Sequence, residues 1–439
     1  MVLHLSTYLS RSPARLLDRI QILSRQYAGH DLTLLFALSA NFSDTQDLGK
    51  AVNGLVQNFD NTRTIGCLSG RLGSTCINGK NIGNDIVSLS VGVWDSKDVK
   101  SFRSTIPGRE EAQVGRWHAF RKKEEEEKRK DYSLNEGVSW EEVWDGGKGA
   151  LLPEELRPLD PSQLNGIIYL SDLKPEGLLS SFHHLPGVTK LGLLASSTPF
   201  ITGRPVTLFH NHSIYSSGAI GLALTGFHQP KPSFKINFLD VRKLSNPMTI
   251  TKCEGNMINA LNDDNPTQLL ISAIKKSGLD THVSGSFKEE QFSLGTLSAD
   301  GNVCMQFTQI TAGDPSRGSL SIDSPFAPPQ GTQVIFLHRP SIAIPSFHLN
   351  PTYPSPSHQQ LNFLTVSDEL HLQLQQPSED HGFEMTIENS FVAASENGFI
   401  FERETCEGEN VKCSLPGSFG TLLLPSSSSS SATTTTTCD

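Results

Sequence analysis

Apolar residues recur along the first part of the chain in two spacings, one typical of strands and one typical of helices. Residues 31–40 (DLTLLFALSA) have a continuously apolar middle, which predicts a buried strand. Before them, Ser12 and Pro13 open a segment whose apolar residues return every three or four positions, and this predicts a helix. Residues 43–46 have the spacing of a capping box and predict the start of a second helix. Strands that alternate with helices indicate an α/β fold.

Further apolar segments, each bounded by Gly, Pro or polar residues, predict a strand-rich remainder. Residues 206–211 (VTLFHN) and 217–226 (SGAIGLALTG) are separated by a short polar turn, which predicts two strands of one hairpin. Apolar spacing predicts helices after Pro175 and over 267–276. Because short strands dominate beyond residue 276, the second half is expected to be mixed α+β. The other predicted strands are 63–67, 85–94, 166–172, 189–196, 234–241 and 248–253, with more within 292–301, 302–310, 318–323 and 332–340.

Three segments interrupt this pattern. Residues from about 101 to 161 are polar, and every position of 121–131 (RKKEEEEKRKD) is charged, which favours an exposed insertion with a solvated helix. The segment of about 339–358 is rich in proline and is expected to be an extended loop or linker. The Ser/Thr-rich tail, 425–439, has no apolar residues to bury and is expected to be disordered.

Length and charge narrow the class of protein. A chain of 439 residues is too long for a single core and is expected to form more than one domain. The net charge of −10 argues against nucleic-acid binding, which needs a basic face. No apolar run reaches the roughly 18 residues that would span a membrane.

The seven cysteines form no disulfide or CxxC pattern, so free thiols and a cytoplasmic location are expected. The arginine-rich, acid-poor N-terminus leaves a mitochondrial location as the alternative.

The common catalytic motifs are absent, so no catalytic or metal-binding residue is predicted. The chain has no GxSxG, GxxxxGK[ST], GxGxxG or HExxH motif. Cys67 follows an apolar strand, which favours a buried and inert thiol; an enzyme built on it would need a histidine within hydrogen-bond reach. His210 and His212 would share one face of a strand, and two ligands alone do not make a zinc site.

Small residues gather where apolar strands end, and this suggests where a ligand would bind. Such loops let a ligand approach the backbone closely, and α/β folds bind ligands outside the carboxyl ends of their strands. Ordinary tight turns are the alternative interpretation. Arg204 is the candidate for an anionic group, unless it simply lies on a solvated turn. The complete set of predicted ligand-binding residues is Cys67, Ser69, Gly70, Arg204, His210, Asn211, Ser217 and Gly218.

Several segments, in this order, resemble the FIST-domain family. Residues 31–40 and 63–70 (RTIGCLSG) are similar to its first core strands, and 217–226 to its small-residue strand. The strongest resemblance is over 250–270 (ITKCEGNMINALNDDNPTQLL), which is similar to the junction before the second part of the domain. The resemblance covers roughly 12–340 and includes ENGFIFE near the end. Two features depart from the family: the charged insertion, and a C-terminal part without the glycine-arginine-rich end of many members.

The resemblance implies a two-part architecture, with mixed sheets flanked by helices and a central cleft. The expected domains are a FIST-N-like part over 1–254 and a divergent FIST-C-like part over 255–424. It further implies a non-enzymatic protein that senses a small molecule or peptide, or recruits a protein partner. Because one animal member stands behind an F-box, a substrate-recruiting adaptor in ubiquitylation is the alternative; an enzyme that uses Cys67 is another. The cofactor is unknown, with haem on His210 or His212 left open because some bacterial members bind haem.

Overall fold

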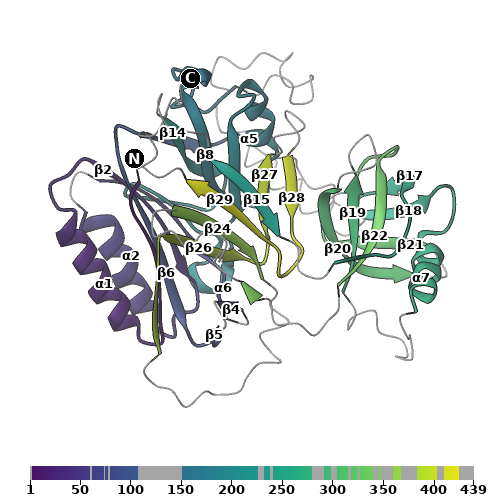
Figure 1. Cartoon of the computed structure of the whole chain (residues 1–439), viewed down its shortest axis with the longest axis horizontal. Coiled ribbons are helices and arrows are strands. Elements are labelled where there is room, and N and C mark those ends of the chain that lie inside the picture. Colours follow the sequence, from purple (N-terminus) through teal and green to yellow (C-terminus); the bar gives the residue numbers. More distant parts are fainter. Residues whose placement is uncertain are drawn as a thin grey trace, which may run out of the picture.

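A computed structural model describes most of the chain, in segments. The predicted charged run 121–131, most of the insertion, most of the proline-rich segment and the whole tail 425–439 lie outside the described residues. Figure 1 shows two lobes, a large one that contains both early and late segments of the chain, and a smaller one built from its middle. The described segments are 2–59, 62–73, 75–77, 80–106, 151–225, 232–237, 241–278, 291–297, 304–314, 318–324, 327–339, 346–347, 359–366, 383–402 and 410–424.

Two helices form the outer layer of the large lobe: α1 (Pro13–Gln26) and α2 (Thr45–Gln57). They lie side by side along one face of a sheet (Figure 1). Both are amphipathic, as predicted, and they bury their apolar faces against that sheet because this removes the most apolar area from water. The capping box predicted over 43–46 would make Ser43 the N-cap residue, and this detail is wrong. Asp44 caps α2 instead, and its side chain accepts a hydrogen bond from the Gln46 amide at 2.8 Å. The buried faces are formed by Leu16, Ile20 and Leu23, and by Leu48, Ala51 and Leu55.

The sheet under these helices joins segments from both ends of the chain. β2 and β3 are parallel, and the early strand β1 pairs with the late strand β25. The strands predicted at 31–40, 63–67 and 85–94 are confirmed as β2, β3 and β6. In the described residues the spatial order is β13 (Ser213–Tyr215), β12 (Leu208–His210), β3 (Arg63–Ser69), β2 (Leu32–Ser39), β6 (Val87–Asp95), β1 (Val2–Ser10) and β25 (Glu384–Glu388).

A second layer of strands packs on the other face of that sheet. Here β8 and β9 are parallel, β14 lies antiparallel to both β8 and β7, and β27 lies antiparallel to β9. A smaller sheet beside them pairs β24 with β26 and β29. The strands are β7 (Val99–Ser104), β8 (Leu164–Ser171), β9 (Thr189–Leu194), β14 (Ala219–Thr225), β27 (Phe399–Glu402) and β28 (Asn410–Cys413), then β15 (Ser233–Asn237), β24 (Gln359–Thr365), β26 (Ser390–Ser395) and β29 (Phe419–Leu424).

A short helix covers the outer face of the second layer, and smaller elements complete the lobe. α5 (Glu176–Ser181), the helix predicted after Pro175, leads into a 3-10 turn over Phe182–His184. Another 3-10 turn, Pro161–Gln163, precedes β8. The remaining elements are β4 (Cys76–Ile77), β5 (Lys80–Asn81), β23 (Ser346–Phe347), β10 (Ser197–Thr198), α6 (Pro199–Thr202) and β11 (Arg204–Val206).

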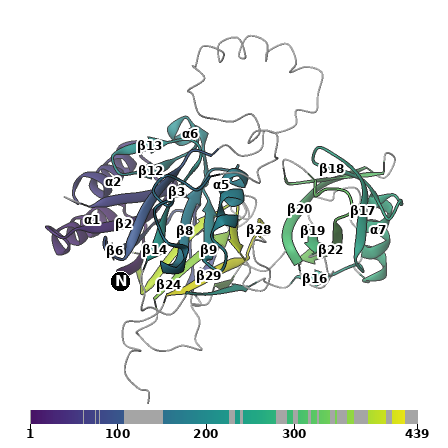
Figure 2. The ribbon, with the colours of Figure 1, turned by 90° about the horizontal axis from the view of Figure 1, so that it is seen from above.

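The small lobe is a closed ring of antiparallel strands with one helix. Successive pairing runs from β17 to β18, β21, β20, β19 and β22, and from β22 back to β17. The predicted helix over 267–276 is α7 (Pro266–Lys276) and lies on the outside of this ring (Figure 2). The strands are β16 (Arg242–Lys243), β17 (Met248–Glu254), β18 (Met257–Leu261), β19 (Gln291–Leu297), β20 (Cys304–Asp314), β21 (Ser319–Ile322) and β22 (Gln333–Arg339).

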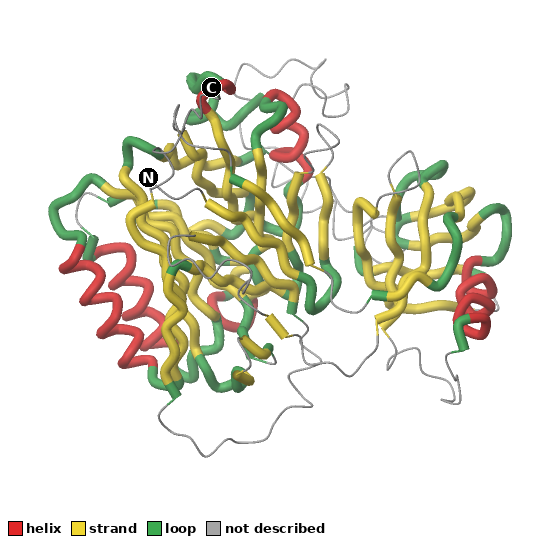
Figure 3. Tube along the Cα trace, in the orientation of Figure 1, coloured by secondary structure: helices red, strands yellow, loops and turns green. Residues whose placement is uncertain are grey.

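The large lobe therefore has four layers, in the order helices, sheet, sheets and helix. One apolar cluster lies between α1, α2 and the first sheet, a second lies between the two layers of strands, and a third lies under α5. Strands occupy the interior and helices lie at the outside (Figure 3). The α/β fold class with mixed sheets flanked by helices is confirmed.

Two predictions about the polypeptide path are wrong. The segments 206–211 and 217–226 do not form one hairpin: β12 pairs with β13 and β3, whereas β14 pairs with β7 and β8 in the other layer. The insertion does not begin near residue 101, because β7 carries the chain into the second layer and buries Phe102 fully. Both errors have one cause: the partner of a strand depends on distant segments, which local apolar spacing does not report.

Candidate functional site

A tight turn at His210–Ser213 places several polar groups at the start of β3. β12 and β13 pair through His210 and Ser213, so Asn211 and His212 form the turn between them. Asn211 has a positive φ of 54°, a conformation that asparagine tolerates better than most residues. Its backbone N–H donates to the Thr64 carbonyl at 2.7 Å, and its side-chain oxygen accepts from the Thr64 N–H at 3.2 Å. Asn211 therefore anchors the turn, and the predicted strand ends before it.

A cavity of about 440 Å³ opens beside this turn. Its lining comes from distant parts of the chain: the start of β3, the middle of β7, the loop before β8 and the β12–β13 turn. β3 belongs to the first sheet and β7 to the second layer, so the cavity lies where the two layers meet. The volume falls in the range of small-molecule sites, roughly 300–1,000 Å³. The lining residues are Thr62, Arg63, Lys100, Ser101, Glu155, His210, Asn211 and His212.

His210 is the half-buried imidazole of this lining. Burial lowers its pKa below the ordinary value of 6.5; the charge of Glu155 raises this pKa in part, and that of Arg103 lowers it further. At neutral pH the ring is therefore mostly uncharged and offers one donor and one acceptor. Its Nε2 atom is shielded from solvent and has no hydrogen-bond partner among the described residues. A buried polar atom without a partner costs stability.

The predicted residues Ser217 and Gly218 lie outside the lining, around Arg103. The guanidinium of Arg103 donates to the carbonyls of Ser217, Ala219 and Ser104, and it stacks over the Tyr215 ring at 4.3 Å. The Gly218 N–H donates to the Asp172 carboxylate at 2.6 Å. Ser217 and Gly218 thus hold the connection between β13 and β14, and neither lines the cavity.

Three predicted residues lie farther along the chain from Arg63, outside the cavity lining. Cys67 and Ser69 are on β3, and Gly70 follows its last residue. Cys67 is fully buried between the two layers of strands, and burial raises the pKa of its thiol to about 12. A thiol with this pKa stays protonated at neutral pH, which removes the basis for Cys67 as a nucleophile. Gly70 lies at the carboxyl end of β3, where its N–H donates to the Ala394 carbonyl at 2.7 Å. These three residues form a packed junction of strand ends, and they do not meet His210.

Arg204 is exposed on β11, next to the short helix α6, and it does not line the cavity. Of the eight predicted ligand-binding residues, only His210 and Asn211 meet at the cavity. The sequence analysis did not identify the two cations of the lining, Arg63 and Lys100, or its carboxylate, Glu155. Isolated charged residues are common on every protein surface, so the sequence contained no signal that would have selected them.

The side chains of the described residues form neither a metal-binding cluster nor a haem pocket at His210 and His212. The described part of the chain contains no cluster of three or more His, Cys, Asp or Glu suited to a metal ion. The cavity is lined by charged and polar side chains, with no large apolar residue among them. A haem macrocycle needs apolar contacts on both faces, so the residues around His210 and His212 do not fit haem.

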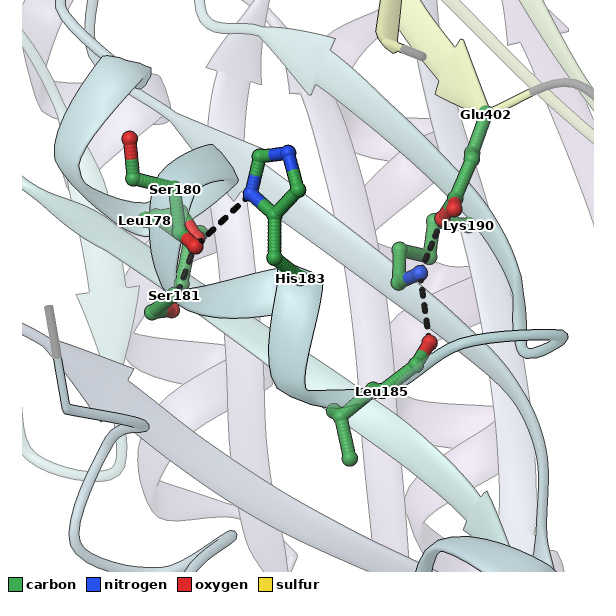
Figure 4. Close-up of polar contacts among 7 residues, drawn as sticks. All are labelled: Leu178, Ser180, Ser181, His183, Leu185, Lys190 and Glu402. Atoms are coloured by element: carbon green, nitrogen blue, oxygen red, sulfur yellow. Dashed lines mark hydrogen bonds and ion pairs between the residues drawn. The ribbon is translucent and has the colours of Figure 1, made fainter. Parts of the chain in front are cut away.

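A second buried polar cluster lies under the short helix α5 and involves Lys190 and Glu402. Their side chains are 1% and 7% exposed and form an ion pair between β9 and β27. The Lys190 ammonium also donates to the Leu185 carbonyl at 2.8 Å (Figure 4). His183 lies apart from the pair and bonds the Ser180 carbonyl at 2.9 Å (Figure 4). The cluster has the geometry of a structural contact, because both charges are satisfied within the protein.

An adaptor needs an exposed apolar patch to hold its partner, and the sequence leads us to expect this patch in the C-terminal half. All of the large hydrophobic side chains that the described structure exposes precede residue 215, and Phe200 on α6 is the most exposed. Recruitment of a protein partner therefore stays a prediction. No helix in the described segments is both long and apolar enough to cross a membrane. The exposed side chains are Leu3, Ile22, Leu151, Leu173, Phe200 and Ile214.

The layers of mixed sheet flanked by helices define an α/β protein, and the polar cavity lies within this fold. The FIST N domain model matches residues 31–264, more than half of the chain, and the protein belongs to the FIST-domain family. The match includes every residue that lines the cavity. A search of curated proteins found no match. The FIST domain is a sensory domain, which indicates a role in signal transduction.

Proposed function

We propose that this protein is a sensor that binds a small molecule in the cavity beside His210. The observation that supports this proposal is the cavity itself: about 440 Å³ at the meeting of two layers, lined by polar groups from distant segments. The half-buried imidazole of His210 belongs to this lining and gives the ligand a ring to contact. Because the lining combines β3 and β7, a ligand would contact both layers of strands at once and stabilise their association.

The proposal is tested by thermal unfolding of the full chain in the presence of a broad panel of metabolites. A ligand that binds only the folded state stabilises it by RT ln(1 + [L]/Kd), about 2.7 kcal/mol at a hundredfold excess over Kd. We expect at least one compound to raise the melting temperature of the wild type, and this increase to disappear in His210→Ala.

His184→Ala is the matched control, because His184 is exposed on the 3-10 turn after α5 and does not line the cavity. This variant should respond to the same compound as the wild type does. A compound that stabilises His210→Ala as strongly as the wild type would refute binding at the cavity. A panel without any stabilising compound would refute the sensor proposal itself.

A further inference from the structure

The charges around the cavity define the class of ligand. We infer that the site takes a small polar anion, which binds Arg63 and Lys100 through its anionic group and donates a hydrogen bond to Glu155. This inference rests on the proposed function, because it concerns the same cavity. It replaces Arg204, the cation expected from the sequence, with two cations that distant segments of the chain bring together.

The lining contains two permanent cations, Arg63 and Lys100, and one carboxylate, Glu155. Arg63 begins β3 in the first sheet, and Lys100 lies on β7 in the second layer, so one anion between them contacts both layers. His210 adds no charge at neutral pH, because burial lowers its pKa. The described lining therefore has one positive charge in excess, although the whole chain has a net charge of −10. A local reversal of sign attracts an anion to one place on an otherwise acidic protein.

Arg103 lies close enough to the lining for its charge to act on His210, and the carboxylates of Asp172 and Glu155 act on Arg103 in turn. Its guanidinium donates to three backbone carbonyls and stacks on Tyr215, and these contacts hold the group in place. It is therefore fixed outside the lining with carboxylates near it, and the anion is assigned to Arg63 and Lys100 alone.

Glu155 can accept a hydrogen bond from a donor group on the ligand. Its Oε1 atom accepts the backbone N–H of Arg103 at 3.3 Å, which ties the carboxylate to β7. A carboxylate is an acceptor only, so it favours an O–H or N–H group of the ligand and repels a second anionic group nearby. The ligand class is therefore an anion that also carries hydroxyl or amino groups, with either a carboxylate or a phosphate as its charged group.

Three probes of similar size show whether an anionic group is needed and which one: gluconate, glucose 6-phosphate and glucose. They share a polyhydroxy chain or ring, and they differ in bearing a carboxylate, a phosphate or no charge. Binding to the full chain is measured by isothermal titration calorimetry in 50 mM NaCl. We expect one or both anions to bind and glucose not to bind, and the anion that binds identifies the charged group.

Arg63→Gln and Lys100→Gln test the assigned contacts. Both side chains are exposed, so their replacement should leave the fold intact, which thermal unfolding monitored by circular dichroism verifies. Each variant is expected to raise Kd about tenfold, equivalent to about 1.4 kcal/mol. The control is Lys97→Gln, which removes the same charge from a nearby exposed position outside the lining and should leave Kd unchanged.

Either of two results with the probes would overturn the inference: glucose binding as tightly as the anions, or no binding of either anion. Unchanged anion affinity in the Arg63→Gln and Lys100→Gln variants would do so too. None of these results decides the sensor proposal, which fails only when the broad panel, including neutral and cationic compounds, gives no stabilisation that depends on His210. The two proposals can therefore fail separately.

Discussion

At the scale of single residues, the buried ion pair of Lys190 and Glu402 has a large effect on stability. The two side chains come from β9 and β27, and both are almost completely removed from solvent. Moving two charges out of water costs several kcal/mol for each ion, and only their mutual attraction and further hydrogen bonds offset this cost. The Leu185 carbonyl supplies one of those bonds to the ammonium. A change of Glu402 alone would therefore leave the Lys190 ammonium buried without its counter-charge.

Glu402→Gln is expected to lower the free energy of unfolding by about 3 kcal/mol, because it leaves the Lys190 ammonium buried without its counter-charge. The double variant Lys190→Met with Glu402→Leu should unfold within about 1 kcal/mol of the wild type, since it removes both charges. Urea unfolding measures both. As a control, Lys50→Gln removes an exposed pair with Asp47 and should cause no measurable change. A Glu402→Gln variant as stable as the wild type would contradict full desolvation of the pair.

At the scale of elements, the path from β12 to β14 determines where the cavity forms. The chain completes the β12–β13 hairpin in one layer and then crosses to the other layer to begin β14. Gly218 stands at this crossing with a positive φ of 78°. A Cβ atom there would lie 2.4 Å from both the Arg103 guanidinium and the Ser104 carbonyl. Only glycine suits a position that combines left-handed backbone with so close an approach.

Gly218→Ala is expected to destabilise the protein by about 3 kcal/mol, because the added methyl group displaces Arg103 as well as straining the backbone. Gly203→Ala separates these two effects: Gly203 has a similar φ of 70°, but nothing lies within 4 Å of a Cβ atom there. It should cost about 1 kcal/mol, the conformational effect alone. Thermal or urea unfolding gives both values. Equal costs for the two variants would mean that contact with Arg103 is unimportant.

At the scale of the whole molecule, the two lobes differ in how much of the chain they need. The apolar cluster inside the small lobe uses residues between 244 and 336 only. The cluster between the layers of the large lobe instead draws on both ends of the chain, from Leu5 of β1 to Leu424 of β29. β1 also pairs with β25, which is more than 370 residues later in the sequence. The large lobe is therefore completed by its last strands.

A fragment of residues 241–339 is accordingly expected to fold by itself, and a fragment of residues 2–278 is not. The first retains its closed ring of strands and the apolar cluster under α7, and it loses only the pairing of β20 with β28 and the packing of Leu297, Phe307, Ile335 and Leu337 against the large lobe. The second loses β24, β26, β27 and β29 and exposes the apolar faces that they cover. Circular dichroism during heating should show a cooperative transition for 241–339 and none for 2–278. A cooperative transition in the 2–278 fragment would show that the late strands are dispensable.

Local sequence patterns predicted the elements better than the site. α1, α2, α5 and α7 were all identified, as were β2, β3 and β6, because apolar spacing reports which face of an element is buried. The cavity was indicated only through His210 and Asn211. Its cations and Glu155 were not, since a charged residue acquires a binding role only from the neighbours that folding gives it.

By itself, the sequence determined the α/β fold class, the order of most elements, the burial of Cys67 and membership of the FIST-domain family. Tertiary structure alone decided which strands pair, that β12 and β14 belong to different layers, and that Lys190 meets Glu402 over 212 positions. The physical reason is the separation along the chain of the residues that interact. Burial and backbone preference act between near neighbours, whereas strand pairing, buried ion pairs and binding sites depend on contacts between segments far apart in the chain.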